Sequence, residues 1–166
     1  MAAIGPEQLA AWFDALAAPL KLYARQWLDA AAAEDVVQEA FLSLMAQNLP
    51  PANLRAWLFR AVRNGAVSAV RSRVRRSRRE QQVAAERGGY FEPSPADLID
   101  ARAAQEAMEG LPQPQREVVV LRLWGQLTLA EIAGLVGSPI STVHDQYRAA
   151  LARIRKQLES PCKKTN

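Results

Sequence analysis

The chain has 166 residues, of which 49% are hydrophobic, and a formal net charge of +4. The hydrophobic content excludes an intrinsically disordered chain, and the length allows one or two folded domains. No apolar run is long enough for a membrane span, and the N-terminus does not resemble a secretory signal, so we expect a cytoplasmic protein without membrane insertion. The single cysteine, Cys162, excludes an internal disulfide and a multi-cysteine metal site. Alternating β-branched runs of strand length are absent, so the predicted fold class is all-α.

Prolines divide the first half of the chain into predicted helices. Pro19 is expected to break the opening helix, and Pro50 and Pro51 force a short connection. Three helices are therefore expected before residue 50, over about residues 6–18, 20–30 and 33–47. Asn53 can then cap a long helix that continues to about residue 76.

The second half begins with a predicted linker over residues 80–95, where helical periodicity is lost and glycine and proline are frequent. Helix resumes at Ser94 and Pro95, which suit the cap and the first turn. That helix ends near Leu111 and Pro112, and another is expected over about residues 115–124.

Residues 128–155, TLAEIAGLVGSPISTVHDQYRAALARIR, indicate two helices joined by a tight turn. Thr128 and Glu131 form a capping box at the start of the first helix, and Gly137 ends it. Ser138 and Pro139 make the corner, and Ser141 can cap the second helix. This pattern is typical of a helix-turn-helix, whose second helix enters a DNA major groove; an ordinary helical hairpin in a bundle is the alternative.

Charge is segregated along the chain. Residues 1–39 hold six acids and two bases, whereas residues 40–79 hold nine arginines and no acid. A solvated helix face normally mixes both signs, so this stretch predicts a surface for a polyanion. Guanidinium groups suit bidentate phosphate contacts and stacking on bases, which favours nucleic acid over an acidic protein or a membrane surface.

The long helix expected over residues 53–76 has an apolar face and a cationic, aromatic face. At about 100° per residue, a stripe about 80° wide collects Trp57, Arg60, Asn64, Ser68, Arg71 and Arg75. The opposite side carries Leu58, Ala61, Val62, Ala66 and Ala69. A tryptophan beside arginines and an amide can stack on an unpaired base. Alternatively, Trp57 folds sideways into the core.

Three separated motifs resemble, in the same order, bacterial RNA polymerase sigma factors of the extracytoplasmic-function (ECF) type. AEDVVQEAFLSLM (residues 33–45) resembles the region that docks on the polymerase clamp. LRAWLFRAVRNGAVSAVR (residues 54–71) resembles the helix that melts and reads the minus-ten promoter element. LPQPQREVVVLRLWGQLTLAEIAGLVGSPISTV (residues 111–143) resembles the domain that reads the minus-thirty-five element. The resemblance covers about residues 12–158.

The resemblance implies three sets of binding residues. The minus-ten set is Trp57, Arg60, Arg63, Asn64, Ser68, Arg71 and Arg75. The minus-thirty-five set is Ser141, Thr142, His144, Asp145, Gln146 and Arg148. The polymerase-binding set is Asp35, Gln38, Glu39 and Leu42, whose acids can meet a basic clamp helix. A solvated acidic face is the alternative reading of the last set.

The resemblance further implies two small helical domains. Sigma domain 2 would occupy residues 1–79, the linker residues 80–95, sigma domain 4 with the helix-turn-helix residues 96–160, and a tail residues 161–166. The implied function is an alternative sigma factor that binds core RNA polymerase through its clamp and flap, directs it to promoters and promotes strand opening. Promoter DNA, duplex and single-stranded, is the second partner, and an anti-sigma factor is left open as a third. We expect no enzymatic activity, no catalytic residue, no cofactor and no metal.

Three other classes of protein account for less of the sequence. A stand-alone helix-turn-helix transcriptional regulator, the main alternative, leaves AEDVVQEAF and the cationic stripe unexplained. An adaptor that sequesters other factors leaves nine unopposed arginines unexplained. A nuclease needs clustered carboxylates or several histidines to hold a metal, and this chain has one histidine.

Overall fold

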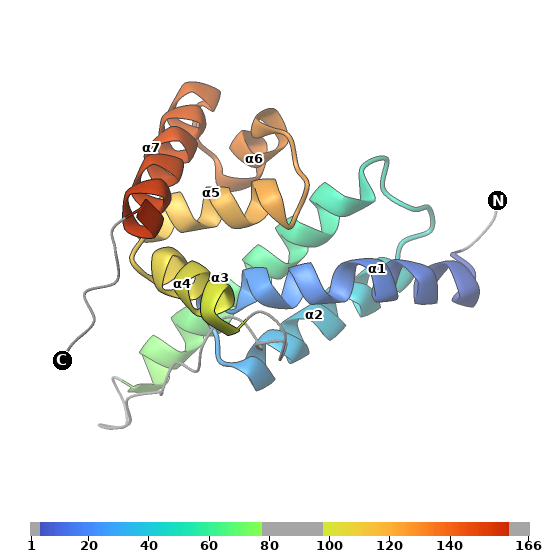
Figure 1. The fold of residues 1–166 in the computed structure, drawn as a ribbon. Helices are drawn as coiled ribbons and strands as arrows, with labels where there is room; N and C mark the ends of the chain where they lie inside the picture. Colours follow the sequence, from blue (N-terminus) through green and yellow to red (C-terminus); the bar gives the residue numbers. More distant parts are fainter. Residues whose placement is uncertain (1–3, 78–97, 160–166) are drawn as a thin grey trace. The chain divides into compact units, whose positions relative to one another are not determined.

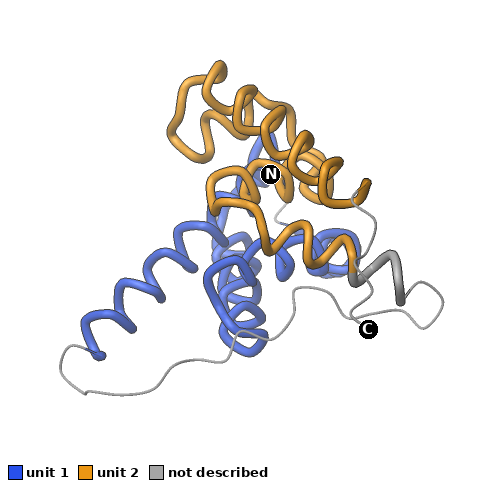
Figure 2. The backbone as a smooth tube through the Cα atoms, turned by 60° about the vertical axis from the view of Figure 1, so that its left-hand side comes forward, with its two compact units in different colours: residues 1–88 blue, residues 89–166 orange. Residues whose placement is uncertain are grey.

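The computed structural model describes residues 4–77 and 98–159, without the side chains of residues 98–102. Within these residues the chain forms helices and turns only, so the all-α prediction is confirmed (Figure 1). The predicted linker, the predicted helix start at Ser94 and Pro95, the tail and Cys162 lie outside the described residues. The chain divides into two compact units, residues 1–88 and 89–166 (Figure 2).

The first unit is a three-helix bundle of α1 (Pro6–Ala24), α2 (Ala30–Met45) and α3 (Leu54–Ser77), in which each helix packs against the other two. Its core combines side chains from all three helices, among them Leu20, Tyr23, Val37, Leu44, Leu58, Phe59 and Val62. The Tyr23 ring meets Trp27 and Phe59 edge-on, with centroids 5.1 and 5.4 Å apart. These edge-on contacts are the arrangement that ring quadrupoles favour.

The prediction that Pro19 breaks the opening helix is wrong, because α1 runs through it as one helix. A proline inside a helix costs about 3 kcal/mol, since it lacks the N–H that closes the ladder. Leu16 and Ala17 before it, and Leu20 and Tyr23 after it, are all buried on one face. Each large side chain buried there stabilises the helix by about 1.5–3 kcal/mol, so continuous packing outweighs the lost hydrogen bond.

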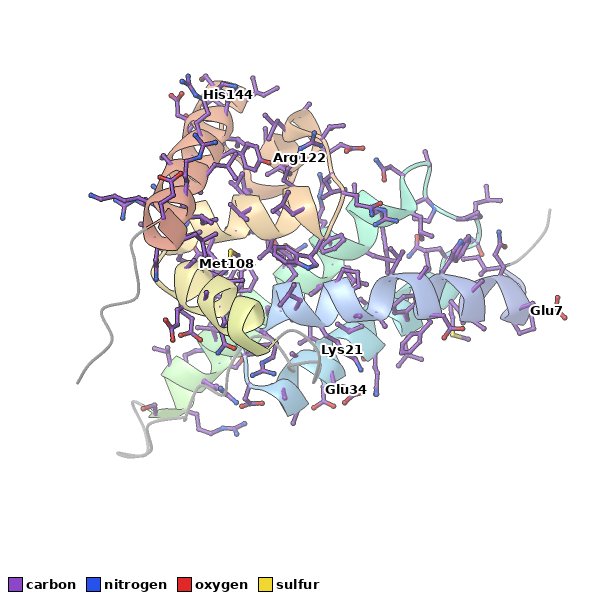
Figure 3. All side chains as sticks on the ribbon, viewed as in Figure 1. Glu7, Lys21, Glu34, Met108, Arg122 and His144 are labelled. Atoms are coloured by element: carbon purple, nitrogen blue, oxygen red, sulfur yellow. The ribbon has the colours of Figure 1, made fainter. Side chains whose placement is uncertain are left out.

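The helix expected over residues 20–30 does not exist as such, because α1 ends at Ala24 and a turn leads to α2. Asp29 decides where α2 begins. Its Oδ1 accepts a hydrogen bond from the backbone N–H of Ala32 at 2.9 Å, which makes it the N-cap. The start of α2 therefore lies three residues earlier than predicted. Lys21 of α1 and Glu34 of α2 bridge the two helices, 2.9 Å apart (Figure 3).

The helix α3 begins where the sequence predicted. Asn53 Oδ1 accepts from the backbone N–H of Ala56 at 3.0 Å, so its predicted role as the cap is confirmed. Along α3, Gly65 lies against α2 so closely that a Cβ atom there would stand 2.9 Å from Val36 Cγ1. The glycine therefore permits the close approach of α2 and α3.

The same carboxylate that caps α2 also holds the far end of α3. Asp29 Oδ2 lies 2.6 Å from Arg73 Nη2. The hydrogen bond from Ala32 and that from Arg73 lower the pKa of Asp29 below its ordinary value of 3.8. Both side chains stay partly exposed, 49% for Arg73 and 36% for Asp29, so water and salt screen the pair.

The second unit contains α4 (Leu98–Glu109), α5 (Gln113–Leu123), α6 (Leu129–Val136) and α7 (Ile140–Glu159). The four consecutive residues Val118 to Leu121 of α5 are all buried, so this helix forms the centre of the unit. α7 packs against the other three helices. Met108 of α4, labelled in Figure 3, is buried in the core with Leu111, Leu127, Ile132 and Val143.

We expect Gly65→Ala to lower the free energy of unfolding by roughly 1 kcal/mol, although alanine in a helix ordinarily stabilises by about that amount over glycine. The reason is that the new Cβ would clash with the stiff, β-branched Val36. In the Val36→Ala background the same change should be neutral or stabilising. Urea unfolding followed by tryptophan fluorescence measures both. An equal effect of Gly65→Ala in the two backgrounds would contradict the close approach.

The charge of Asp29 should make the stability of the first unit depend on pH. Asp29→Asn keeps an oxygen that can cap α2 but removes the charge that pairs with Arg73. Because folding lowers the pKa of Asp29, its ionised form stabilises the fold above pH 3.8, and this contribution is lost as the pH falls through the lowered value. The wild type should therefore exceed Asp29→Asn in unfolding free energy at pH 7, by no more than about 1 kcal/mol for an exposed pair.

Urea unfolding of both proteins between pH 7 and pH 2 measures this difference. It should shrink only in the acidic part of that range. A difference that stays constant over the whole range would show that the Asp29 charge does not stabilise the fold.

Candidate nucleic-acid interface

The predicted stripe on α3 is formed by one side of the helix. Its buried side carries Leu58, Phe59, Val62 and Ala66. Five of the six stripe residues are exposed: Arg60, Asn64, Ser68, Arg71 and Arg75. Because a helix links its two faces rigidly, the packing that buries one side aims the cationic side at solvent.

Trp57, the sixth stripe residue, is half-buried. It therefore lies at the boundary between the core and the stripe, which leaves part of its ring free to meet a ligand. Arg63 of the minus-ten set is also half-buried and lies about 60° outside the stripe.

The polymerase-binding set lies on the outer face of α2. Asp35, Gln38 and Glu39 are exposed, and Leu42 is 58% exposed. Two more apolar side chains that follow Leu42 in the sequence are also exposed, Met45 at 56% in the last position of α2 and Leu49 at 53% in the connection to α3. We call Leu42, Met45 and Leu49 the apolar edge. Sequence reasoning missed its last two members. Helical spacing places Met45 on the same side of α2 as Leu42, but it does not show whether another helix covers that side.

The turn before the helix-turn-helix is held by α5. Arg122 Nη1 donates to the backbone carbonyl of Leu127 at 2.9 Å (Figure 3). Within the turn, a Cβ at Gly125 would stand 2.5 Å from the Leu121 carbonyl oxygen, so no side chain fits there. The turn therefore fixes how α6 leaves α5.

The predicted capping box at the start of α6 is confirmed. Thr128 Oγ1 accepts from the backbone N–H of Glu131 at 3.2 Å, and Glu131 Oε2 accepts from that of Thr128 at 2.7 Å. Gly137 ends the helix with φ of 73°, a left-handed conformation that favours glycine. Its N–H and that of Ser138 both donate to the Ala133 carbonyl, which closes the corner.

The prediction that Ser141 caps the second helix is wrong. α7 begins at Ile140, and the backbone N–H of Val143 donates to the Pro139 carbonyl at 3.1 Å. Ser141 therefore lies inside the first turn. Proline has no N–H to leave unsatisfied, so the helix starts directly after it.

The minus-thirty-five set follows the first turns of α7. Val143 and Ala150 face the core, whereas Ser141, Thr142, His144, Asp145 and Arg148 are exposed. His144, labelled in Figure 3, projects away from the helix near its start. Gln146 is half-buried and lies only about 40–60° from the buried side chains, so it is turned toward the packing face.

Two family models match the chain, Sigma-70 region 2 over residues 12–76 and Sigma-70 region 4 over residues 101–158. The ECF RNA polymerase sigma factor EcfG of Rhodopseudomonas palustris is 30% identical over 131 residues, which cover 74% of this chain and 68% of that protein. The chain belongs to the family of ECF RNA polymerase sigma factors. The resemblance stated from the sequence motifs is thereby confirmed.

This ECF sigma factor is also similar to a second curated protein and to a solved structure. The probable RNA polymerase sigma factor RfaY of Xanthomonas campestris is 33% identical over 139 residues, or 78% of this chain. The chain spans 35% of the length of that protein. The sigma factor RpoE of Bartonella quintana, solved in complex with the anti-sigma factor NepR, has the same fold with a TM-score of 0.76 at 23% identity. That likeness covers 95% of this chain and 99% of the solved one.

The candidate surfaces of this ECF sigma factor fall inside the two family matches. The match to region 2 contains most of α1, all of α2 and nearly all of α3, hence the acidic face of α2 and the cationic stripe of α3. The match to region 4 contains α5, α6 and the exposed first turns of α7. Among the described residues, no group of three histidines, cysteines or acids could hold a metal. In that same part of the chain, every helix is too short or too polar to cross a bilayer.

Proposed function

We propose that this protein is an alternative sigma factor that binds core RNA polymerase, directs it to specific promoters and assists strand opening. The observation that carries the proposal is the arrangement of side chains on α3. Burial of one face of this helix exposes an arginine-rich stripe with Trp57 at its boundary, and this stripe lies within the match to Sigma-70 region 2. Aromatic rings and guanidinium groups hold unpaired bases and phosphates together. The protein acts in the cytoplasm and is not itself an enzyme, since the polymerase supplies the catalysis.

Each of the two units has a role in this proposal. Residues 1–79 form the domain that binds the polymerase clamp and the minus-ten strand, and residues 96–160 form the domain that binds the flap and reads the minus-thirty-five duplex. Residues 80–95 connect them, and residues 161–166 are a tail. The exposed polar residues of the first turns of α7 suit the donor and acceptor pattern of a major groove.

The proposal includes an anti-sigma factor as a further partner of this protein. The solved structure of RpoE contains an anti-sigma factor, NepR. The fold of RpoE itself is shared over 95% of this chain. A stand-alone helix-turn-helix regulator would use α6 and α7 but would leave the acidic face, the apolar edge and the stripe of the first unit without a role.

The acidic face of α2 supports a prediction on polymerase binding. The double change Asp35→Lys and Glu39→Lys should weaken association with core RNA polymerase at least tenfold, which is about 1.4 kcal/mol. The reason is that two lysines would then face a basic clamp helix and repel it. Affinity measured by fluorescence anisotropy at fixed salt tests this.

A matched control is the double change Glu7→Lys and Asp14→Lys, which alters the net charge equally through exposed acids of α1. It should leave the affinity nearly unchanged. Leu42→Ala tests the apolar edge and should weaken binding as well. If the two double variants bind equally, the acidic face of α2 is not the docking surface.

The two DNA surfaces should fail in different ways. Trp57→Ala and Asn64→Ala should leave closed-complex formation nearly normal but reduce strand opening, because stacking on one base contributes about 1–3 kcal/mol. Arg148→Ala should weaken promoter binding itself, most at low salt, because the variant loses a phosphate contact and the counterion release that goes with it. Permanganate footprints of the holoenzyme on duplex and pre-opened bubble templates separate the two cases, with a promoter selected by transcription from a genomic pool.

The bubble template should rescue the α3 variants and should not rescue Arg148→Ala. Trp57→Phe keeps an aromatic face and should retain most of the opening activity. Arg153→Ala removes the same charge from α7 outside the predicted set and serves as the control for Arg148→Ala. A bubble that fails to rescue Trp57→Ala, or that rescues Arg148→Ala fully, would refute this division of roles.

A further inference from the structure

The last part of α3 contains no buried residue. Ala66 is the last buried residue of this helix, and residues 71–77 are all exposed. At about 1.5 Å per residue, the helix extends some 16 Å beyond Ala66. A helical segment of this length is marginally stable in water by itself. Yet it carries Arg71 and Arg75, two of the stripe residues.

Arg73 lies on the opposite side of this segment from the stripe. At about 100° per residue, it is about 20° from Val62 and Ala66 and about 160° from Trp57 around the helix. It therefore continues the packing face after the apolar residues end. Its guanidinium meets Asp29 Oδ2 at 2.6 Å, across 44 positions of sequence.

Asp29 is itself fixed in place. Its other oxygen, Oδ1, accepts from the backbone N–H of Ala32 at 2.9 Å and so caps α2. One carboxylate thus joins the start of α2 to the end of α3. The hydrogen bonds from Ala32 and Arg73 also lower the pKa of Asp29, which keeps it ionised at neutral pH.

We propose that Arg73 is a positioning residue and not a DNA contact: its ion pair with Asp29 fixes the last two turns of α3. The pair thereby holds Arg71 and Arg75 in line with Trp57 and Asn64. Residues 40–79 contain no acid, so a carboxylate that anchors this arginine lies outside that stretch, and Asp29 of the acidic residues 1–39 is the one that pairs with it. The part of this inference that concerns DNA rests on the proposed function; the part that concerns α3 does not.

Asp29→Asn distinguishes the positioning role by the sign of its effect on DNA binding. The change keeps a good capping oxygen and alters no arginine. If Asp29 were only an acid near a polyanion, its neutralisation would tighten binding. A positioning role predicts the opposite, a loss of threefold or more in affinity of the holoenzyme for the bubble template. Unchanged or tighter binding would overturn the proposal.

Hydrogen exchange of the free protein, measured by mass spectrometry, tests the helix without DNA. Asp29→Asn and Arg73→Gln should both increase exchange of the backbone amides of residues 70–77 severalfold. Arg73→Lys, which can keep the pair, should restore protection. Arg76→Gln is the matched control, because it removes the same charge from an exposed neighbour outside the stripe and should leave exchange unchanged.

The two measurements separate this inference from the proposed function. Equal exchange in Arg73→Gln and Arg76→Gln would overturn the positioning role. Failure of the wild-type holoenzyme to bind the bubble template would overturn the proposed function alone, since the exchange measurement uses no DNA.

Discussion

Burial of one face of α3 against α1 and α2 is the constraint on which the first unit depends. Leu58, Phe59 and Val62 are fully buried, and they fix the rotation of the helix about its axis. Because side chains of a helix repeat every 3.6 residues, the same rotation turns the arginine stripe toward solvent. In the second unit, Val143 and Ala150 fix α7 in the same way and leave the other side of its first turns exposed.

Segregation of charge along the chain becomes segregation of surfaces in the fold. Three of the six acids of residues 1–39 lie on α2, and seven of the nine arginines of residues 40–79 lie on α3. A surface of one sign attracts a partner of the other, so the first unit can meet a basic protein and an anionic strand through different helices. Asp29 has a different role, since it pairs with Arg73 and joins α2 to α3 within the unit.

The candidate sites were predictable to the extent that they depend on helical periodicity. The stripe on α3 and the outer face of α2 follow from spacing, and the exposure of Asn64, Arg71 and Glu39 agrees with it. Trp57 was not predictable, because a large ring at the boundary between two faces goes where its neighbours leave room. The full extent of the apolar edge also escaped, because exposure of an apolar residue depends on which helix covers it.

The sequence by itself determined the all-helical class, the cap at Asn53, the capping box at Thr128 and the stop at Gly137. These features depend on hydrogen bonds and backbone conformations within four residues, so the local sequence contains all their partners. Only the tertiary structure decided that α1 continues through Pro19 and that Asp29 meets Arg73. Both outcomes depend on packing between segments far apart in the chain, and the free energy of that packing exceeds the local preferences that oppose it.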